Sequence, residues 1–534
     1  MSESAKKQSF LHGAALLAMA TAAVKIIGAL YKIPLKMIIG DLGFGYFNTA
    51  YEIYSVLLMI STAGLPVAMS RMVSQAATLK NYNQVRRVYN TARGIFVGLG
   101  LVSTLLMVLG CRALANFQRQ PDAWFAILCL GPCALLVGIM STYRGFFQGQ
   151  GNMIPTSVSQ VLEAVFKLVV GLVLAYGLLK YTNNIALAAG GAILGVTGSC
   201  LISVIYLRKK FGSAYRQLPV TTGKVSTFGA TAKGLLAIAV PITIGSAGLQ
   251  LLTVLETNLY MGQLLTVNGL NHEAAGTMKG IYNFSQTIFN MPCAFIIPIT
   301  ISIIPAITSQ LTLQNNRGVR ATEESAARVT GIISLPCAVG LSLLARPVMA
   351  LLGGYTGEKL ELATQLMFLL GVAIFPYAII QYTNAVLQAH GKAMVPVVNM
   401  LLAGAVKLAV VYILAGNPAI GILGAPLGAL LCYLCISVLN LISIRKYVAQ
   451  KPALVINLLR PLLPAAIMGV AVYFSYWLLQ RVLGADGSRI LLCGLPVAVG
   501  VVVYCVAVVF CKTITRADCQ LLPKGDKIAK FLNL

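Results

Sequence analysis

The stretch "FNTAYEIYSVLLMISTAGLPVAMSRMVSQ" at 47–75 recurs in altered form as "YNFSQTIFNMPCAFIIPITISIIPAITSQ" at 282–310. At this offset of 235 residues, Asn48 meets Asn283. Each copy contains an apolar run of about 20 residues, the length that crosses a bilayer as a helix. The pair therefore indicates a membrane protein built from two related halves.

A second pair of segments repeats at nearly the same spacing. "QGQGNMIP…KLVVGLVL" matches "QAHGKAMVP…KLAVVYIL" at an offset of 240, so that Gly151 meets Gly391 and Lys167 meets Lys407. Each half then holds six helices, and because six is an even number the halves have parallel orientation. This is the two-lobed plan of many transporters, with the symmetry axis along the membrane normal.

The composition supports a polytopic membrane protein. Of 534 residues, 58% are hydrophobic and only 10% are charged, and the mean hydropathy is +0.83. Soluble domains carry about 25% charged residues. We predict an all-α fold of about fourteen transmembrane helices, with two pseudo-symmetric six-helix lobes and two C-terminal helices. The predicted spans are 13–39, 46–74, 92–110, 123–143, 154–179, 185–207, 234–265, 281–310, 328–352, 361–388, 395–415, 420–443, 455–480 and 489–511.

The spans and the repeat divide the chain into four predicted parts. These are an N-terminal six-helix lobe at 1–210, a cytoplasmic basic linker at 211–233, a C-terminal six-helix lobe at 234–446, and two extra helices with a basic cytoplasmic tail at 447–534. We expect the first span to be an uncleaved membrane helix, because the apolar run continues past any signal-peptide cleavage point.

The formal net charge of +26 follows the predicted topology. Inner segments hold 26 of the 40 basic residues and outer segments hold eight, which predicts that both termini are cytoplasmic. The excess therefore indicates topology and affinity for anionic lipid, not a nucleic-acid surface. No GxxxxGK[ST] loop is present, so no nucleotide motor is predicted. Cys432 and Cys435 form a CxxC inside a span, which favours packing, and we predict no metal site and no cofactor.

Nine charged residues fall inside predicted spans or at their ends. Each costs about 2.5–3.5 kcal/mol at a helix centre, so such residues usually face a wet cavity or a partner. Seven of the nine lie in the first half, which predicts one anionic substrate bound mostly by the first lobe. The nine are Lys25, Lys32, Lys36, Glu52, Arg71, Glu163, Lys167, Glu256 and Lys407.

Three of these lysines form a stripe on the first span. Lys25, Lys32 and Lys36 are seven and four residues apart, spacings that bring all three onto one helix face. Lys25 lies near the middle of the span and is assigned to the cavity. Lys36 approaches the outer interface, so a cavity role and snorkelling both stay open.

The remaining charges have alternative interpretations. Glu163 and Lys167 are four residues apart, so they either neutralise each other or face the cavity. Lys407 cannot be neutralised in this way, because Ala403 occupies the position that corresponds to Glu163 of the first half. Arg71 is assigned to interfacial anchoring.

Glu52 and Glu256 are predicted to be partners for the lysines or proton-linked groups. The predicted cavity lining is Lys25, Lys32, Lys36, Glu52, Lys167 and Lys407, with Glu163 and Glu256 as coupling groups or charge partners. No catalytic residue is predicted.

Two motifs resemble a known group. "ISTAGLPVAMSRMVSQ" at 60–75, followed by "YRGFFQGQGNMIPTSVSQVLE" at 143–163, is similar to the polysaccharide-export and lipid II flippase families of Gram-positive bacteria. This is the stage V sporulation protein B type within the multidrug/oligosaccharidyl-lipid/polysaccharide (MOP) exporter superfamily. The resemblance covers nearly the whole chain.

The resemblance implies alternating access and flipping of an undecaprenyl-diphosphate-linked glycan from the inner to the outer leaflet of the bacterial plasma membrane. It implies that basic residues of the first span face the cavity, matched at Lys25 and about one position off at Lys32. It also implies a lipid-tail groove on the last two helices, and drive by the membrane potential or an ion gradient.

Lipid II is the first choice of substrate, and capsule, teichoic-acid and spore-cortex precursors stay open. A multidrug/cation antiporter of the same superfamily is the alternative, which Glu52 and Glu163 keep open. An enzyme such as a glycan polymerase is disfavoured, because the predicted outer loops show no clustered acidic pair. A channel fits the repeat and its proline breaks less well. The expected partners are a polyprenyl-diphosphate-linked oligosaccharide, membrane lipids and a coupling ion, without nucleic acid, and the protein is expected to be a monomer.

Overall fold

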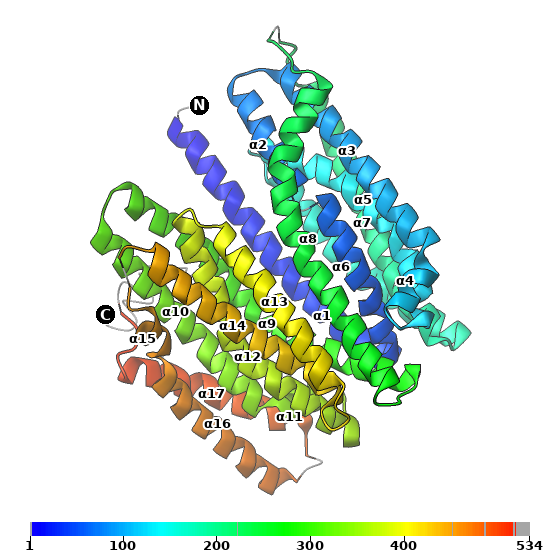
Figure 1. Ribbon diagram of the computed structural model, residues 1–534, viewed down its shortest axis with the longest axis vertical. Coiled ribbons are helices and arrows are strands. Elements are labelled where there is room, and N and C mark those ends of the chain that lie inside the picture. The colour runs from blue at the N-terminus through cyan, green and yellow to red at the C-terminus, as the bar shows by residue number, and fades with distance from the viewer. Residues whose placement is uncertain are drawn as a thin grey trace. The chain divides into compact units, whose positions relative to one another are not determined.

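The computed structural model describes residues 3–62, 64–221, 223–450, 452–484, 487–515 and 518. Over these residues the chain forms helices joined by short turns, and no strand occurs among them (Figure 1). Two units are distinguished by their internal contacts, Met1–Asn283 and Phe284–Leu534. The prediction of an all-α polytopic fold is confirmed.

The first unit contains eight α-helices and the start of a ninth. Its longest helix is interrupted at Gly40, whose φ of 68° lies in the left-handed region that favours glycine. The elements are α1 (Glu3–Thr62), α2 (Leu65–Thr78), α3 (Tyr82–Leu109), α4 (Cys111–Phe117), the 3₁₀ turn η1 (Pro121–Ala123), α5 (Trp124–Gly149), α6 (Ile154–Thr182), α7 (Ile185–Arg216), α8 (Phe228–Thr266) and α9 (His272–Thr312).

The second unit begins within α9 and ends with a pair of helices, α16 and α17, that pack on each other. We call α15, α16 and α17 together the terminal hairpin. The remaining elements are α10 (Asn316–Leu343), α11 (Ala345–Leu352), α12 (Gly357–Ala389), α13 (Met394–Ala415), the 3₁₀ turn η2 (Gly421–Leu423), α14 (Gly424–Tyr447), α15 (Leu454–Leu459), α16 (Leu462–Leu483) and α17 (Arg489–Phe510).

The predicted spans fall on helical segments, but 46–74 runs from α1 into α2, 328–352 from α10 into α11, and 455–480 from α15 into α16. Within the described part of the chain, eleven helical segments are long and apolar enough to cross a membrane. The first of these, Leu30–Thr78, takes in parts of two predicted spans, because α1 continues past Gly40 into the next helical stretch. The chain is a multi-pass membrane protein.

The internal repeat is visible in two matching turns. Lys80 and Gln314, 234 residues apart, both have a φ of 54° at the end of a helix. The residue after each one caps the following helix: the Asn81 side chain accepts from the Gln84 amide (3.1 Å), and the Asn315 side chain accepts from an amide three residues on (3.0 Å). The two units therefore share the geometry that starts α3 and α10.

A second pair of turns matches at the other anchor. Gly151 and Gly391 have φ values of 78° and 73°. The Gly151 amide donates to the Gln148 carbonyl and the Gly391 amide to the Gln388 carbonyl, both at 3.0 Å. These bonds close a left-handed helix end that glycine fills without strain. The short helices α4 and α11 also occupy matching places, after α3 and α10.

The division at 211–233 stays a prediction. The first unit extends through that segment and includes α8, which packs on α1 and α2. Figure 1 shows α8 running beside α2 in the first unit. The predicted boundary between the lobes at 211–233 and the boundary between the two units after Asn283 thus fall at different points of the chain.

A close glycine contact joins α6 and α7. A Cβ on Gly195 would lie 2.3 Å from the Cα of Gly171, so the two backbones touch at this point. Small residues permit such close approach between membrane helices. A Cβ on Gly198, one turn along α7, would meet nothing within 4 Å.

Gly195→Val is therefore expected to force α6 and α7 apart and destabilise the protein by about 1–3 kcal/mol, the usual cost of overpacking. Gly198→Val is the matched control, since it places the same β-branched residue on the same helix. Thermal unfolding in detergent measures both variants. Equal melting temperatures for the two variants would contradict the contact.

Candidate functional site

Two lysines and two tyrosines lie together between α1 and α6. The Lys167 ammonium of α6 lies over the Tyr31 ring (5.5 Å to the centroid) and the Tyr51 ring (5.8 Å). Both tyrosines belong to α1, one on each side of the bend at Gly40. Aromatic faces attract cations, so the rings hold the Lys167 ammonium between the two helices.

Lys32 joins this group. It is next to Tyr31 in α1, is partly buried, and interacts electrostatically with Lys167 and Glu52. Over the residues that the structure describes, neither Lys32 nor Lys167 has a carboxylate within ion-pair distance (4 Å). Two like charges close together in a membrane protein favour an anion between them.

Glu52 belongs to a hydrogen-bonded cluster in which its carboxylate is paired with Lys279. Lys279 Nζ donates to Glu52 Oε2 (3.1 Å) and to Thr49 Oγ1 (2.6 Å), and Gln118 Nε2 donates to the same carboxylate oxygen (3.3 Å). The Lys279 side chain is completely buried and that of Glu52 is 13% exposed. The cluster ties α9 to α1 and leaves Lys32 and Lys167 as the net positive charge.

Lys279 lies two residues before the predicted span 281–310, but the structure places it on a helix. The predicted span began at 281, whereas α9 begins at His272 and carries Lys279 into the interior. Helix ends are the least certain part of a sequence-based assignment. The sequence signal that could have pointed to a buried cation such as Lys279 was Glu52, because an acid inside an apolar helix requires a cationic partner.

The other two lysines of the predicted stripe differ from Lys32. Lys36 is buried and forms an ion pair with Asp41 within α1 (3.4 Å), so it does not extend to an interface. The side chain of Lys25 lies outside the described residues. Only Lys32 of the three is therefore placed by the structure beside Lys167.

Glu163 pairs with an arginine that the sequence interpretation had assigned to an inner segment. Its Oε2 accepts from Arg144 Nη2 (3.1 Å), and Arg144 Nε also donates to Ser159 Oγ (2.9 Å). Lys167 interacts with Glu163 at longer range. Of the two interpretations, close mutual neutralisation of Glu163 and Lys167 is thus not what the side chains show.

The second unit holds amides at the corresponding positions. At the offset of 240, Asn384 and Asn399 stand where Arg144 and Ser159 stand. Asn440 bridges them, accepting from Asn399 Nδ2 and donating to Asn384 Oδ1, both at 2.9 Å. The same place between three helices is charged in the first unit and neutral in the second.

The last two predicted site residues, Glu256 and Lys407, lie on other helices than α1 and α6. Glu256 is buried on α8, and Lys407 is partly buried on α13 of the second unit. Their roles stay predictions. In the described part of the chain, no group of three or more His, Cys, Asp and Glu residues is arranged to hold a metal ion.

Comparison with known proteins places this geometry in context. The family model described as "Polysaccharide biosynthesis protein" matches residues 10–311. The lipid II flippase MurJ of Bacillus subtilis is 25% identical over 491 residues, which cover 88% of this chain and 89% of that protein.

Two solved structures share the fold. An inward-facing multidrug resistance MATE family transporter of the MOP superfamily has a TM-score of 0.66 at 15% identity, covering 81% of this chain and 99% of the other. The lipid II flippase MurJ in an inward closed conformation has a TM-score of 0.64 at 13% identity, covering 93% and 98%. The resemblance to the polysaccharide-export families is confirmed by the family model, and the chain shares its fold with a transporter of the MOP superfamily. These relatives are transporters and flippases, not enzymes.

The Glu52–Lys279 pair generates a stability prediction. Glu52→Gln or Lys279→Met alone leaves one buried charge without its partner, which costs about 3–5 kcal/mol. The double variant is expected to recover part of this loss, and a double-mutant cycle from unfolding in detergent measures the coupling. Arg346→Met is the control, since the Arg346–Glu361 pair is exposed and should matter little. Purely additive single effects would contradict the pairing.

Proposed function

The chain belongs to the polysaccharide biosynthesis protein family, and from that premise we propose that it is a flippase for an undecaprenyl-diphosphate-linked glycan. It moves this lipid from the inner to the outer leaflet, with lipid II the first choice. One observation carries the proposal: Lys167 lies over the ring of Tyr31, the neighbour of Lys32 in α1, and neither lysine has a carboxylate in ion-pair distance over the described residues.

A diphosphate suits this pair of cations. Its negative charge is spread over several oxygens, and lysine ammonium groups are compact cations with three rotatable donors. In the proposed complex Lys32 and Lys167 bind the diphosphate, with Lys25 and Lys36 of the same stripe and Lys407 as further candidates. The Tyr31 and Tyr51 rings keep the Lys167 ammonium in place when the site is empty.

Transport then follows alternating access. The hydrophilic sugar crosses through the cavity while the polyprenyl tail stays in lipid. An anion that moves outward across an inside-negative membrane gains about 2.3 kcal/mol per charge per 100 mV, so the membrane potential favours the proposed direction. An ion gradient is a second source of drive, with Glu52, Glu163 and Glu256 as the candidate coupling groups or charge partners.

The setting of this activity is part of the proposal. We place the protein in the bacterial plasma membrane as a monomer, with both termini in the cytoplasm. The support is the excess of Lys and Arg in the predicted inner segments.

A multidrug/cation antiporter is the second candidate, favoured by the MATE-like fold. Such a carrier needs a carboxylate that is available to a cation or proton. In this structure Glu52 is bonded to Lys279 and Glu163 to Arg144, so cations already hold both carboxylates. The net positive pair therefore favours an anionic substrate. Capsule, teichoic-acid and spore-cortex precursors carry the same diphosphate and are open alternatives to lipid II.

The test is leaflet exchange of fluorescent lipid II in liposomes that contain the purified protein. Lys32→Gln and Lys167→Gln each remove one diphosphate partner, and charge-assisted bonds of about 1.5–3 kcal/mol predict losses of about 10- to 100-fold. Lys25→Gln tests the first lysine of the stripe. Lys180→Gln, at the exposed end of α6, is the matched control and should exchange lipid like the wild type.

Each other outcome has a distinct meaning. Exchange that is unaffected by Lys32→Gln and Lys167→Gln would retain the flippase and discard this site. No exchange of lipid II by folded wild-type protein, with exchange of another lipid-linked glycan, would change the substrate. Proton- or sodium-driven uptake of a cationic dye, without lipid exchange, would favour the antiporter.

A further inference from the structure

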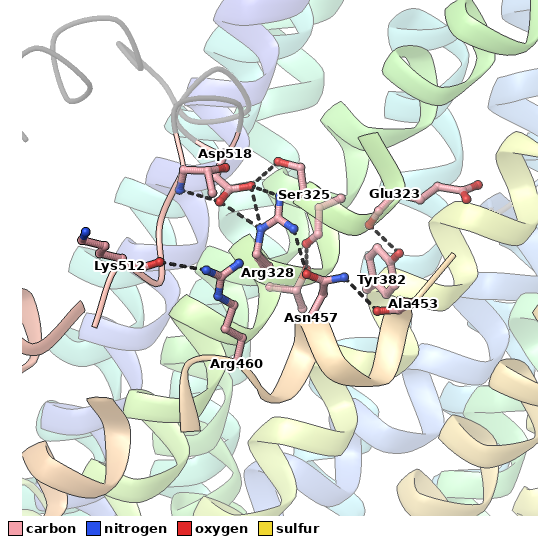
Figure 2. A network of polar contacts seen from close by, with 12 residues as sticks. Glu323, Ser325, Arg328, Tyr382, Ala453, Asn457, Arg460, Lys512 and Asp518 are labelled. Atoms are coloured by element: carbon pink, nitrogen blue, oxygen red, sulfur yellow. Dashed lines mark hydrogen bonds and ion pairs between the residues drawn. The ribbon is translucent and has the colours of Figure 1, made fainter. Parts of the chain in front are cut away.

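One arginine of α10 binds both ends of the terminal hairpin (Figure 2). Arg328 Nη1 donates to Asn457 Oδ1 on α15 (2.8 Å), just before α16 begins. Arg328 Nη2 donates to Asp518 Oδ1 (3.0 Å) and Nε to Asp518 Oδ2 (3.1 Å), after α17 ends. The planar guanidinium thus binds the Asp518 carboxylate through two bonds on one side and the Asn457 amide on the other.

The Asp518 carboxylate is fully enclosed by donors. The Ser325 hydroxyl donates to Oδ1, and the Thr515 amide donates to Oδ2 (2.8 Å). The Asp518 side chain is 0% exposed and that of Arg328 is 12% exposed. A buried carboxylate is stable only with such complete pairing, so Asp518 occupies a built receptor on α10.

Further bonds join the two ends to each other and to α10. Arg460 Nη2, at the end of α15, donates to the Lys512 carbonyl (3.0 Å), which bridges the entry and the exit of the hairpin. The Ala453 amide donates to Glu324 Oε1 (3.0 Å). Figure 2 shows Ala453, Arg460 and Lys512 near Arg328.

The backbone contact between α10 and α15 is also close. A Cβ on Gly331 would lie 2.4 Å from the Leu458 carbonyl oxygen. On the exit side, Ile514 packs with Ile332 of α10 and Tyr504 of α17. The hairpin is therefore seated on α10 at both ends, with Arg328 at the centre of the seat.

The repeat shows that this arrangement is particular to the second unit. Arg93 of α3 corresponds to Arg328 at the offset of 235, but it is exposed. In the described part of the first unit, one long helix, α8, follows α7, whereas α15, α16 and α17 follow α14 in the second unit. The same arginine position is thus free to solvent or lipid in α3 and becomes a clamp in α10.

We propose that Arg328 is the positioning residue for the terminal hairpin, fixing α16 and α17 to α10 so that they move with it as one body during transport. Because one guanidinium binds both Asn457 and Asp518, loss of either bond is expected to loosen the segment before α16 and the segment after α17 together. The effect on transport rests on the proposed function, whereas the clamp itself does not.

The first measurement is hydrogen exchange of the full chain in nanodiscs. Arg328→Lys keeps the charge but lacks the planar fork, and Asp518→Asn keeps the shape but lacks the charge. Both variants are expected to raise exchange about tenfold at α15 and at 511–515 together, with no change in α3 or α5. Arg93→Lys is the matched control and should change nothing.

The second measurement is lipid II exchange by the same variants. We expect the maximal rate to fall about fivefold or more while the concentration for half-maximal rate stays the same, because the cavity lysines are untouched. A variant that merely unfolds would lose protection throughout the chain.

One result would overturn the clamp: exchange that rises only at 511–515 in Asp518→Asn and leaves α15 protected in Arg328→Lys, which would mean independent ends. Raised exchange at both ends with an unchanged transport rate would keep the clamp and overturn its role in transport. If wild-type protein moves no lipid-linked glycan, the proposed function fails, and the hydrogen exchange still decides whether the clamp exists.

Discussion

The need of each buried charge for a partner organises this protein. Charged groups in an apolar medium are costly, so they occur in pairs or face water. Lys36 has Asp41, Lys279 has Glu52, Arg144 has Glu163 and Arg328 has Asp518. Against this rule Lys32 and Lys167 stand out, since neither has a carboxylate within ion-pair distance among the described side chains, and Lys167 lies instead over two tyrosine rings. Under the proposed function, an anionic substrate supplies the missing negative charge.

The sequence predicted the parts of the fold that depend on local physics. Apolar runs mark the spans, because length and hydropathy decide insertion. The repeat aligned Gly151 with Gly391, where the structure shows matching turns. Pairings between distant helices were not predictable. Arg144 and Lys279 were assigned to connections, and only the packing of α5 on α6 or α9 beside α1 shows which acid each one meets.

The two units use one helix plan with different chemistry. Between α5, α6 and α7 the polar cluster is an arginine, a serine and a glutamate, whereas the matching helices of the second unit carry asparagines. Asparagine amides bond to each other without net charge, so they hold helices together but attract no ion. The duplicated scaffold therefore carries a charged polar cluster in the first unit and a neutral one in the second.

The bend at Gly40 divides α1 into two arms that carry different side chains of the candidate site. Tyr31 and Lys32 lie on the arm before the bend, and Tyr51 and Glu52 lie on the arm after it. A left-handed residue with no side chain is a natural pivot, since its backbone dihedral angles turn with little steric resistance. A small change of angle at this pivot alters the distance between Lys32 and Glu52 and the spacing of the two rings around Lys167. Under the proposed function, the backbone angle at Gly40 would then set the electric potential that the anionic substrate meets beside Lys32 and Lys167. The bend of α1 would in this way tune the affinity of the site.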